Sequence, residues 1–360
     1  MATVTPLPLL AITALLALAL AGVLLVTGQT APQLAAHLAF ALGVMPLVLA
    51  ALGYFVPVLT RSGAASRTAA WGPPMMALAG GVLAVSSFAT DFSATGLSLA
   101  ASLAGIAAIS LGAWTLRRAQ HMLGPRHRGL DWYLAALGFL LLALLAIILM
   151  PHFPEQRNAL RLFHLHANLL GFIGLAALGT LQVLLPTCIG QSDPEAALRL
   201  RRDVGWAAGS ALLIAVGTAL TRPGQGVAAA PALALLGAVI YGGVVLRTLH
   251  AWRTRFGSGL VQAHGAAPSL VSATLGLLGL LILGIAHGFG GLPARPAVAG
   301  FVIAFLLPLV SGAAAQLLPT WLRPGPQSPW HQALRARLCR WGGVRGLTLL
   351  LLGLLIAGLP

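Results

Sequence analysis

Charged side chains are scarce in this 360-residue chain, and lysine is missing altogether. Asp, Glu, Lys and Arg together make up 8% of the residues, only six side chains are acidic, and all 21 basic residues are arginine. Hydrophobic residues account for 58%. So few charged side chains cannot cover a large water-exposed surface. The composition therefore excludes a sizeable soluble domain and predicts a polytopic membrane protein.

Cysteines and the common catalytic motifs are also nearly absent. The two cysteines, Cys188 and Cys339, are both expected on the cytoplasmic side, which predicts free thiols and no disulfide framework. There is no phosphate-cradling glycine loop, no CxxC and no HExxH. All acidic residues lie in or beside predicted loops, which argues against proton pumping through a mid-membrane carboxylate. They are Asp91, Asp131, Glu155, Asp193, Glu195 and Asp203.

Long apolar segments are what the sequence does contain. A helical bilayer crossing needs about 20 apolar residues. We predict an all-α polytopic membrane protein with about 11 (11–12) transmembrane helices, forming a single integral membrane domain over residues 1–360. The first segment has no positively charged stretch before it and is expected to be a retained helix. The spans are 8–27, 35–59, 73–90, 95–116, 131–150, 161–187, 204–220, 228–246, 266–287, 297–319 and 343–359.

The arginines fall unevenly between the predicted loops. With the N-terminus in the cytoplasm, 17 lie on the cytoplasmic side and four outside: Arg157, Arg161, Arg222 and Arg295. This is the positive-inside pattern of a multi-pass protein of the plasma (inner) membrane. The net charge of +15 therefore reports orientation and contact with anionic headgroups of the lipid bilayer. Nucleic acid is not an expected partner.

Three helices end in a similar way. Pro57, Pro186 and Pro319 each follow an apolar pair near the end of a span, and they are 129 and 133 residues apart. Each interval holds four predicted helices, so the closing helices, about 35–59, 161–187 and 297–319, all cross in the same direction. The pattern predicts a threefold pseudo-symmetric four-helix repeat and argues against the two-halved plan of many carriers.

Two histidines share a position within this repeat. His37 and His166 each precede the closing proline by 20 residues, whereas the third repeat has Ala299 at that register. Twenty helical residues span about 30 Å, which places both imidazoles near the outer face. Two imidazoles at one depth are suited to hold the iron of a b-type haem. Arg161 and Arg157 are candidates to pair with its propionates, as are the other two outer arginines.

His164 points away from His166, because residues two apart on a helix differ by about 200°. Asn168 shares the side of His164. With His287 and His152, His164 is a candidate for a second metal or haem site. The alternative hypothesis is a haem-free transporter or scaffold in which the histidines are packing residues. A transporter would need a polar cavity near mid-membrane, lined by groups such as Gln182 and Gln316.

Two segments resemble a known family. HLHANLLGFIGLAALGTLQVLLPTCIG, residues 164–190, resembles the HxH helix of haem–copper oxidase subunit I. HLAFALGVMPLVLAALGYFVPVLTR, residues 37–61, resembles the early haem-ligand helix of that family. The first segment is also similar to the NnrS-type haem-and-copper membrane proteins of the nitric oxide response. The superfamily is built as three arcs of four helices, in agreement with the repeat.

The resemblance implies a cofactor and a role. His37 and His166 would be the axial ligands of haem b, and His164 would match the HxH histidine that binds the active-site haem of the oxidases. The implied role is electron transfer, with a redox partner or quinone, or nitric oxide/copper-related redox handling. Copper is the second implied cofactor, although no His-Pro-Glu or His-His motif is present and HxH lies on the sixth helix rather than the tenth. A full oxygen or nitric oxide reductase is not implied.

Overall fold

The computed structural model describes residues 6–90, 93–122, 124–221, 229–288, 292 and 294–358. These residues form α-helices with short 3-10 and π-helical segments, and no strand occurs among them. Eleven helical spans within the described ranges are long and apolar enough to cross a membrane. The predicted class, an all-α polytopic membrane protein, is therefore confirmed. Cys188 and Cys339 are free thiols, as predicted.

The chain folds as two compact units, each built from segments that are distant in the sequence. The first comprises Met1–Gly43, Leu181–Pro194 and Val245–Pro360, and the second comprises Val44–Thr180 and Glu195–Val244. The prediction of one integral membrane domain stays a prediction.

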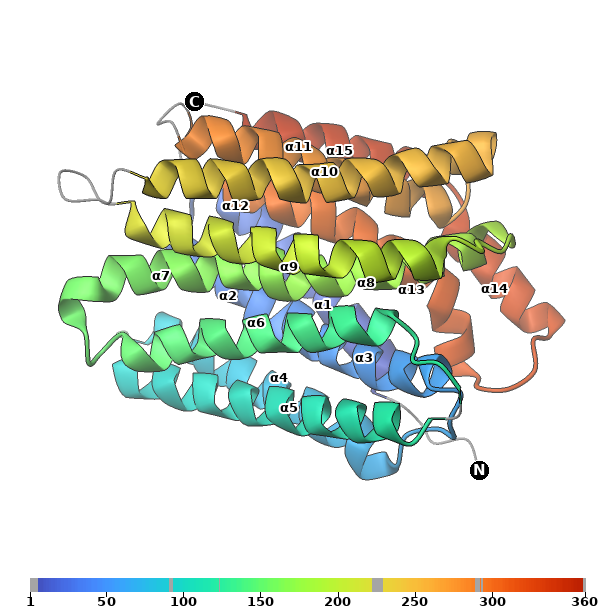
Figure 1. Cartoon of the computed structure of the whole chain (residues 1–360), viewed down its shortest axis with the longest axis horizontal. Helices are drawn as coiled ribbons and strands as arrows, with labels where there is room; N and C mark the ends of the chain where they lie inside the picture. Colours follow the sequence, from blue (N-terminus) through green and yellow to red (C-terminus); the bar gives the residue numbers. More distant parts are fainter. Residues whose placement is uncertain are drawn as a thin grey trace. The chain divides into compact units, whose positions relative to one another are not determined.

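The second unit contains a series of neighbouring helices. Within it, α4 (Arg67–Ala89) and α5 (Ala94–Gln120) lie side by side (Figure 1). They approach closely, since a Cβ added to Gly80 would lie 2.8 Å from the carbonyl oxygen of Ala100. Ser66 and Ser93 cap these two helices by accepting the amides of Ala69 and Gly96. The elements are α3 Met45–Leu59, α4 Arg67–Ala89, α5 Ala94–Gln120, α6 Gly129–Leu149, η2 Pro154–Gln156, α7 Arg157–His166, η3 Ala167–Gly174, α9 Ala196–Leu220, and the first parts of α8 Leu175–Ile189 and α10 Ala230–Phe256.

The first unit is also held together by backbone-to-backbone contact. A Cβ on Gly276 of α11 or Gly353 of α15 would overlap the backbone of Ala304, so both helices pack directly on η5. Small residues permit this close approach where lipid offers no hydrophobic drive for association. The elements are α1 Leu7–Thr27, α2 Pro32–His37, η1 Leu38–Val44, η4 Gly257–Leu260, α11 Ala267–Gly288, α12 Ala294–Gly300, η5 Phe301–Leu306, α13 Leu307–Leu322, α14 Pro329–Cys339 and α15 Gly342–Ala357.

Several helices are longer than their apolar segments. The span predicted at 73–90 begins at Arg67, the one predicted at 204–220 begins at Ala196, and the one predicted at 228–246 continues to Phe256. The added turns carry arginines, which the headgroup region solvates without ending the helix. Hydropathy therefore locates the apolar part of a helix and misses its polar ends.

The three closing helices share an uncommon local geometry. Each contains a π-helical segment, η1, η3 and η5, that starts 18 or 19 residues before Pro57, Pro186 or Pro319. The π-helix occupies well under 1% of residues in proteins, so its recurrence at one register supports the predicted repeat. In the first and third repeats the π segment comes just before a proline, Pro46 or Pro308. Proline has no amide N–H to donate to the carbonyl four residues earlier, as the α-helix requires.

Candidate functional site

The two histidines of matched register stand at matched points in local structure. His37 is the last residue of α2 in the first unit, and η1 follows it directly. His166 is the last residue of α7 in the second unit, and η3 follows it directly. Both side chains are partly buried. Single π-turns inside helices are frequent at functional sites, which makes these two positions the leading candidates in the chain.

Both imidazoles are held in the same way. His37 Nδ1 lies 2.7 Å from the carbonyl oxygen of Gln33, and His166 Nδ1 lies 2.9 Å from that of Leu162, each four residues earlier. A carbonyl oxygen can only accept, so Nδ1 carries the proton in each ring. The lone pair then lies on Nε2. This is the tautomer that metal-binding histidines adopt when a backbone carbonyl fixes the ring.

A second element orients His166. The hydroxyl of Thr218, on α9, donates to the carbonyl of Ile214 at 2.8 Å, and its oxygen lies 3.1 Å from His166 Nδ1. With its proton directed at Ile214, the threonine oxygen accepts from the imidazole. The His166 proton is thus shared between its own helix and α9, which fixes the direction of the ring.

His164 faces another helix. Its Nδ1 lies 2.9 Å from the carbonyl oxygen of Ala143 on α6, so this ring also carries its proton on Nδ1. Asn168 donates to the backbone carbonyl of His164 at 3.0 Å, and its amide nitrogen lies 3.3 Å from Nδ1. The HxH pair is therefore split between α6 and α9, in the opposed directions that the helical spacing predicts.

The suggested second metal or haem site of His164 with His287 and His152 stays a prediction, because His164 lies in the second unit and His287 in the first. His287, at the end of α11 in the first unit, hydrogen-bonds through Nδ1 to the carbonyl of Leu292. His152 is exposed in the turn after α6. Among the described residues, no group of three or more His, Cys, Asp or Glu side chains could hold a metal ion. A bis-imidazole site needs only two protein ligands, so the haem hypothesis does not depend on such a group.

The structure describes the side chains of two of the four arginines that are predicted to lie on the outer side. Arg157 and Arg161 lie on the first turns of α7 and are exposed. The guanidinium of Arg161 donates to Asn158 Oδ1 at 3.0 Å. Arg222 and the side chain of Arg295 lie outside the described residues. Pairing of these arginines with propionates stays a prediction.

The glycines beside His166 are used for packing. A Cβ on Gly171 would overlap the ring of Phe139, one on Gly174 would overlap the hydroxyl of Tyr241, and one on Gly179 would lie 2.6 Å from Trp132 Cβ. These three aromatic side chains come from α6 and α10. The glycines therefore give no support to a macrocycle at those positions.

Tyr241 is a residue that the sequence reasoning missed. It is fully buried, and its hydroxyl donates to the carbonyl of Leu170 inside η3 at 3.0 Å. The amide of Leu175, which a regular π-turn would direct at Leu170, instead bonds the carbonyl of Phe172. Tyr241 thus supplies a donor where the helix is irregular. The sequence feature that could have indicated this contact is a single tyrosine within an otherwise apolar segment.

One other histidine shows which features distinguish the candidate pair. His121, at the end of α5, also bonds through Nδ1 to a carbonyl four residues earlier, that of Arg117, at 2.7 Å. It is exposed and precedes a loop rather than a π segment. The Nδ1 bond is therefore common to helical histidines, and the π segments and repeat register set His37 and His166 apart.

Comparisons with known protein families, curated proteins and solved structures gave no match to this chain. The resemblance to haem–copper oxidase subunit I and the NnrS-type proteins stays a prediction, and the functional interpretation depends on the geometry above.

Proposed function

We propose that this protein is an integral membrane haem protein in which His37 and His166 supply the axial nitrogens of a b-type haem. The observation that carries the proposal is the local structure that both residues share. Each ends an α-helical segment, precedes a π segment at one repeat register, and holds its proton on Nδ1. The donor chemistry fits, because this tautomer presents Nε2 to a metal.

The remaining contacts support an electron-transfer role. A bis-histidine b haem supplies a one-electron iron couple when bound. Gln33, Leu162 and Thr218 accept the Nδ1 protons, which orients the rings and increases the basicity of Nε2. If His37 and His166 both held the iron, no protein-free position would remain for a substrate, so the group would supply electron transfer rather than substrate binding. The donor or acceptor would be a protein partner or a membrane quinone.

The finer assignments belong to the same proposal. A plasma (inner) membrane location with a cytoplasmic N-terminus is supported by the arginine distribution. Nitric oxide or copper-related redox handling is supported by the resemblance of residues 164–190 to the NnrS-type proteins. His164, directed at α6, would be the residue to examine for such a role.

The test is a reduced-minus-oxidised optical spectrum of the purified protein, produced with ample haem. Sharp low-spin bands are expected in the wild type and in His121→Ala, a matched control with the same Nδ1 bond. The bands should disappear in His37→Gly and His166→Gly and return when imidazole is added, which separates loss of a ligand from misfolding. A featureless wild-type spectrum, or bands that survive in both glycine variants, contradicts the proposal.

A haem-free transporter or scaffold is the second candidate, and one observation favours it. Gln182 on α8 is fully buried, and neither amide atom has a hydrogen-bond partner among the described residues. An unsatisfied buried amide is rare and calls for water or a polar ligand beside it. A polar solute passing this point would meet that need. The featureless spectrum described above would place this candidate first.

A further inference from the structure

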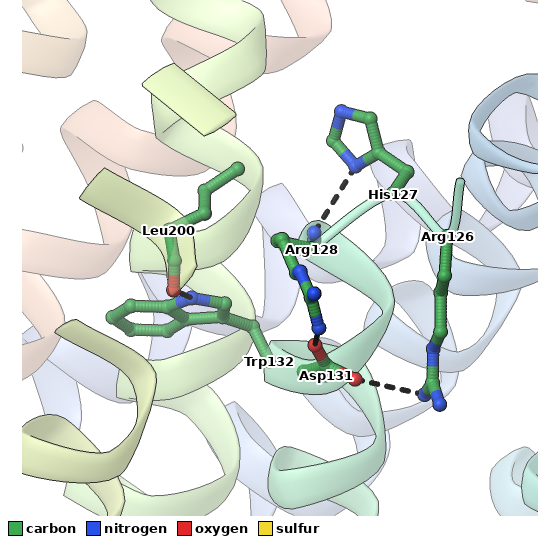
Figure 2. Close-up of polar contacts among 7 residues, drawn as sticks. Arg126, His127, Arg128, Asp131, Trp132 and Leu200 are labelled. Atoms are coloured by element: carbon green, nitrogen blue, oxygen red, sulfur yellow. Dashed lines mark hydrogen bonds and ion pairs between the residues drawn. The ribbon is translucent and has the colours of Figure 1, made fainter. Parts of the chain in front are cut away.

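Arginines gather at one end of the second unit. Arg118 donates to Ser62 and to the carbonyl of Gly63, which joins the end of α5 to the loop after α3. Trp132 Nε1 donates to the carbonyl of Leu200 at 2.9 Å (Figure 2), which joins the start of α6 to the start of α9. Around these contacts are nine arginines and three acids: Arg61, Arg67, Arg117, Arg118, Arg126, Arg128, Arg199, Arg201 and Arg202, with Asp131, Glu195 and Asp203.

Asp131 and Asp203, two of the three acids, are already engaged with some of these cations. Asp131 lies between Arg126 and Arg128, at 2.9 and 3.6 Å (Figure 2). Asp203, which is fully buried, accepts two bonds from Arg202, at 2.8 and 3.1 Å. Three carboxylates cannot neutralise nine guanidinium groups, so this end of the unit carries a net positive charge and attracts anions.

A shallow, open surface pocket lies at the start of α9 within this charged end. It has a volume of about 520 Å³ and is lined by Glu195, Leu198, Arg199, Arg201 and Arg202. The bidentate contact with Asp203 fixes the direction of the Arg202 guanidinium. Arg201 is exposed at the rim. The pocket therefore combines the oriented guanidinium of Arg202, the exposed guanidinium of Arg201 at its rim and the exposed apolar side chain of Leu198.

An exposed apolar stripe continues from the pocket along α9. Leu198 and Trp206 are 69% and 57% exposed, and Leu212 is also exposed. Between them, Gly205 and Gly209 are exposed, and a Cβ on either would meet nothing within 4 Å. The spacing of three and four residues puts this stripe on one face. The opposite face of α9 packs on α6, α7 and α10.

We propose that an anionic phospholipid binds along this face of α9. Its phosphate would occupy the pocket at Arg201 and Arg202, and an acyl chain would lie over Gly205 and Gly209 beside Trp206. The charge excess favours an anion, and the adjoining stripe favours an anion that carries a hydrocarbon chain. Arg202 and Leu212 are about 15 Å apart along the helix, about half the hydrocarbon thickness, which suits one acyl chain. The inference is independent of the haem proposal.

The test is native mass spectrometry of the full chain in detergent, with phosphatidylglycerol and phosphatidylcholine of identical acyl chains. The wild type should retain phosphatidylglycerol in preference. Arg201→Gln should weaken this retention about fivefold, as expected for one arginine at a lipid surface. Arg337→Gln, which removes one exposed arginine of α14, is the matched control and should retain the lipid. Inorganic phosphate at equal concentration should not displace it.

A second variant tests the acyl-chain part. Gly209→Leu fills the stripe without meeting a neighbour, so the helix should be preserved while lipid retention falls. Equal retention of both lipids, or equal losses in Arg201→Gln and Arg337→Gln, would refute the proposal. So would a dimer that Gly209→Leu dissociates without altering lipid retention, because a second copy of the chain would then occupy this face.

Discussion

The hydrogen bond from Tyr241 to the π segment after His166 gives a prediction about stability that holds with or without a cofactor. The variant is Tyr241→Phe, which removes one oxygen and keeps the buried ring. The carbonyl of Leu170 then loses a donor at a point where the Leu175 amide is directed elsewhere. Leaving a buried acceptor without its donor costs about 1–3 kcal/mol.

The matched control is Tyr133→Phe on α6. Tyr133 is also buried, and its hydroxyl lies 3.1 Å from Thr180 Oγ1. Thr180 donates to the carbonyl of Ala176 at 2.7 Å, so its hydroxyl keeps one hydrogen bond when the Tyr133 donor is removed. A side-chain hydrogen bond between membrane helices is worth about 0.6 kcal/mol on average, and we expect a loss of that size.

Thermal unfolding in detergent, followed by circular dichroism, distinguishes the two variants. A change of 1 kcal/mol shifts Tm by about 2–4 °C for a unit of 150–250 residues. Tyr241→Phe should therefore lower Tm by about 2–12 °C, and Tyr133→Phe by about 1–2 °C. The reasoning about the irregular turn is refuted if the two variants are equally stable or if Tyr133→Phe is the less stable one.

Three further variants address other parts of the chain. Burial, and then the charge of Arg61, lower the pKa of His127, whose Nδ1 accepts the amide of Gly129. Between that lowered pKa and 6.5 the unfolded chain binds more protons than the folded chain, so stability should fall as the pH drops through this window. The Tm of His127→Asn should therefore change less between pH 8 and pH 5 than the Tm of the wild type. Gln182→Leu should raise Tm if the amide only packs, whereas a fall in Tm would indicate a bound polar ligand. Gly179→Ala would place a methyl group 2.6 Å from Trp132 Cβ on α6, so it should lower the free energy of unfolding in urea by about 1–3 kcal/mol. An unchanged urea midpoint would show that α6 moves to accommodate the methyl group.

Much of the architecture was predictable because lipid imposes simple demands on a chain. A helix that crosses hydrocarbon must be apolar over about 20 residues, so the number and order of the spans follow from apolar runs. Helix ends were less predictable. Arginines at Arg67 and in the first turns of α9 continue the helix into the headgroup region, and hydropathy does not register them.

The candidate site shows a similar division. The register of His37 and His166 against the closing prolines is a property of the sequence alone. The sequence also predicts that His164 and His166 point apart, because helical geometry fixes the angle between residues two positions apart.

The partners of those histidines were decided by tertiary structure. Ala143 lies 21 residues from His164, and Thr218 lies 52 residues from His166. Nothing local to the HxH segment specifies contacts so distant along the chain. The bond from Tyr241 to η3 spans 71 residues and was equally hidden.

The sequence by itself therefore determined the class of protein, its spans, its repeat and the two histidines of matched register. These features depend on hydropathy and on spacing along single helices, which local composition encodes. The tertiary structure decided which carbonyl or hydroxyl holds each imidazole proton, which aromatic ring fills the space beside each glycine, and which arginines meet at one end of the second unit. Those features depend on how separate helices pack, which is a property of the whole chain.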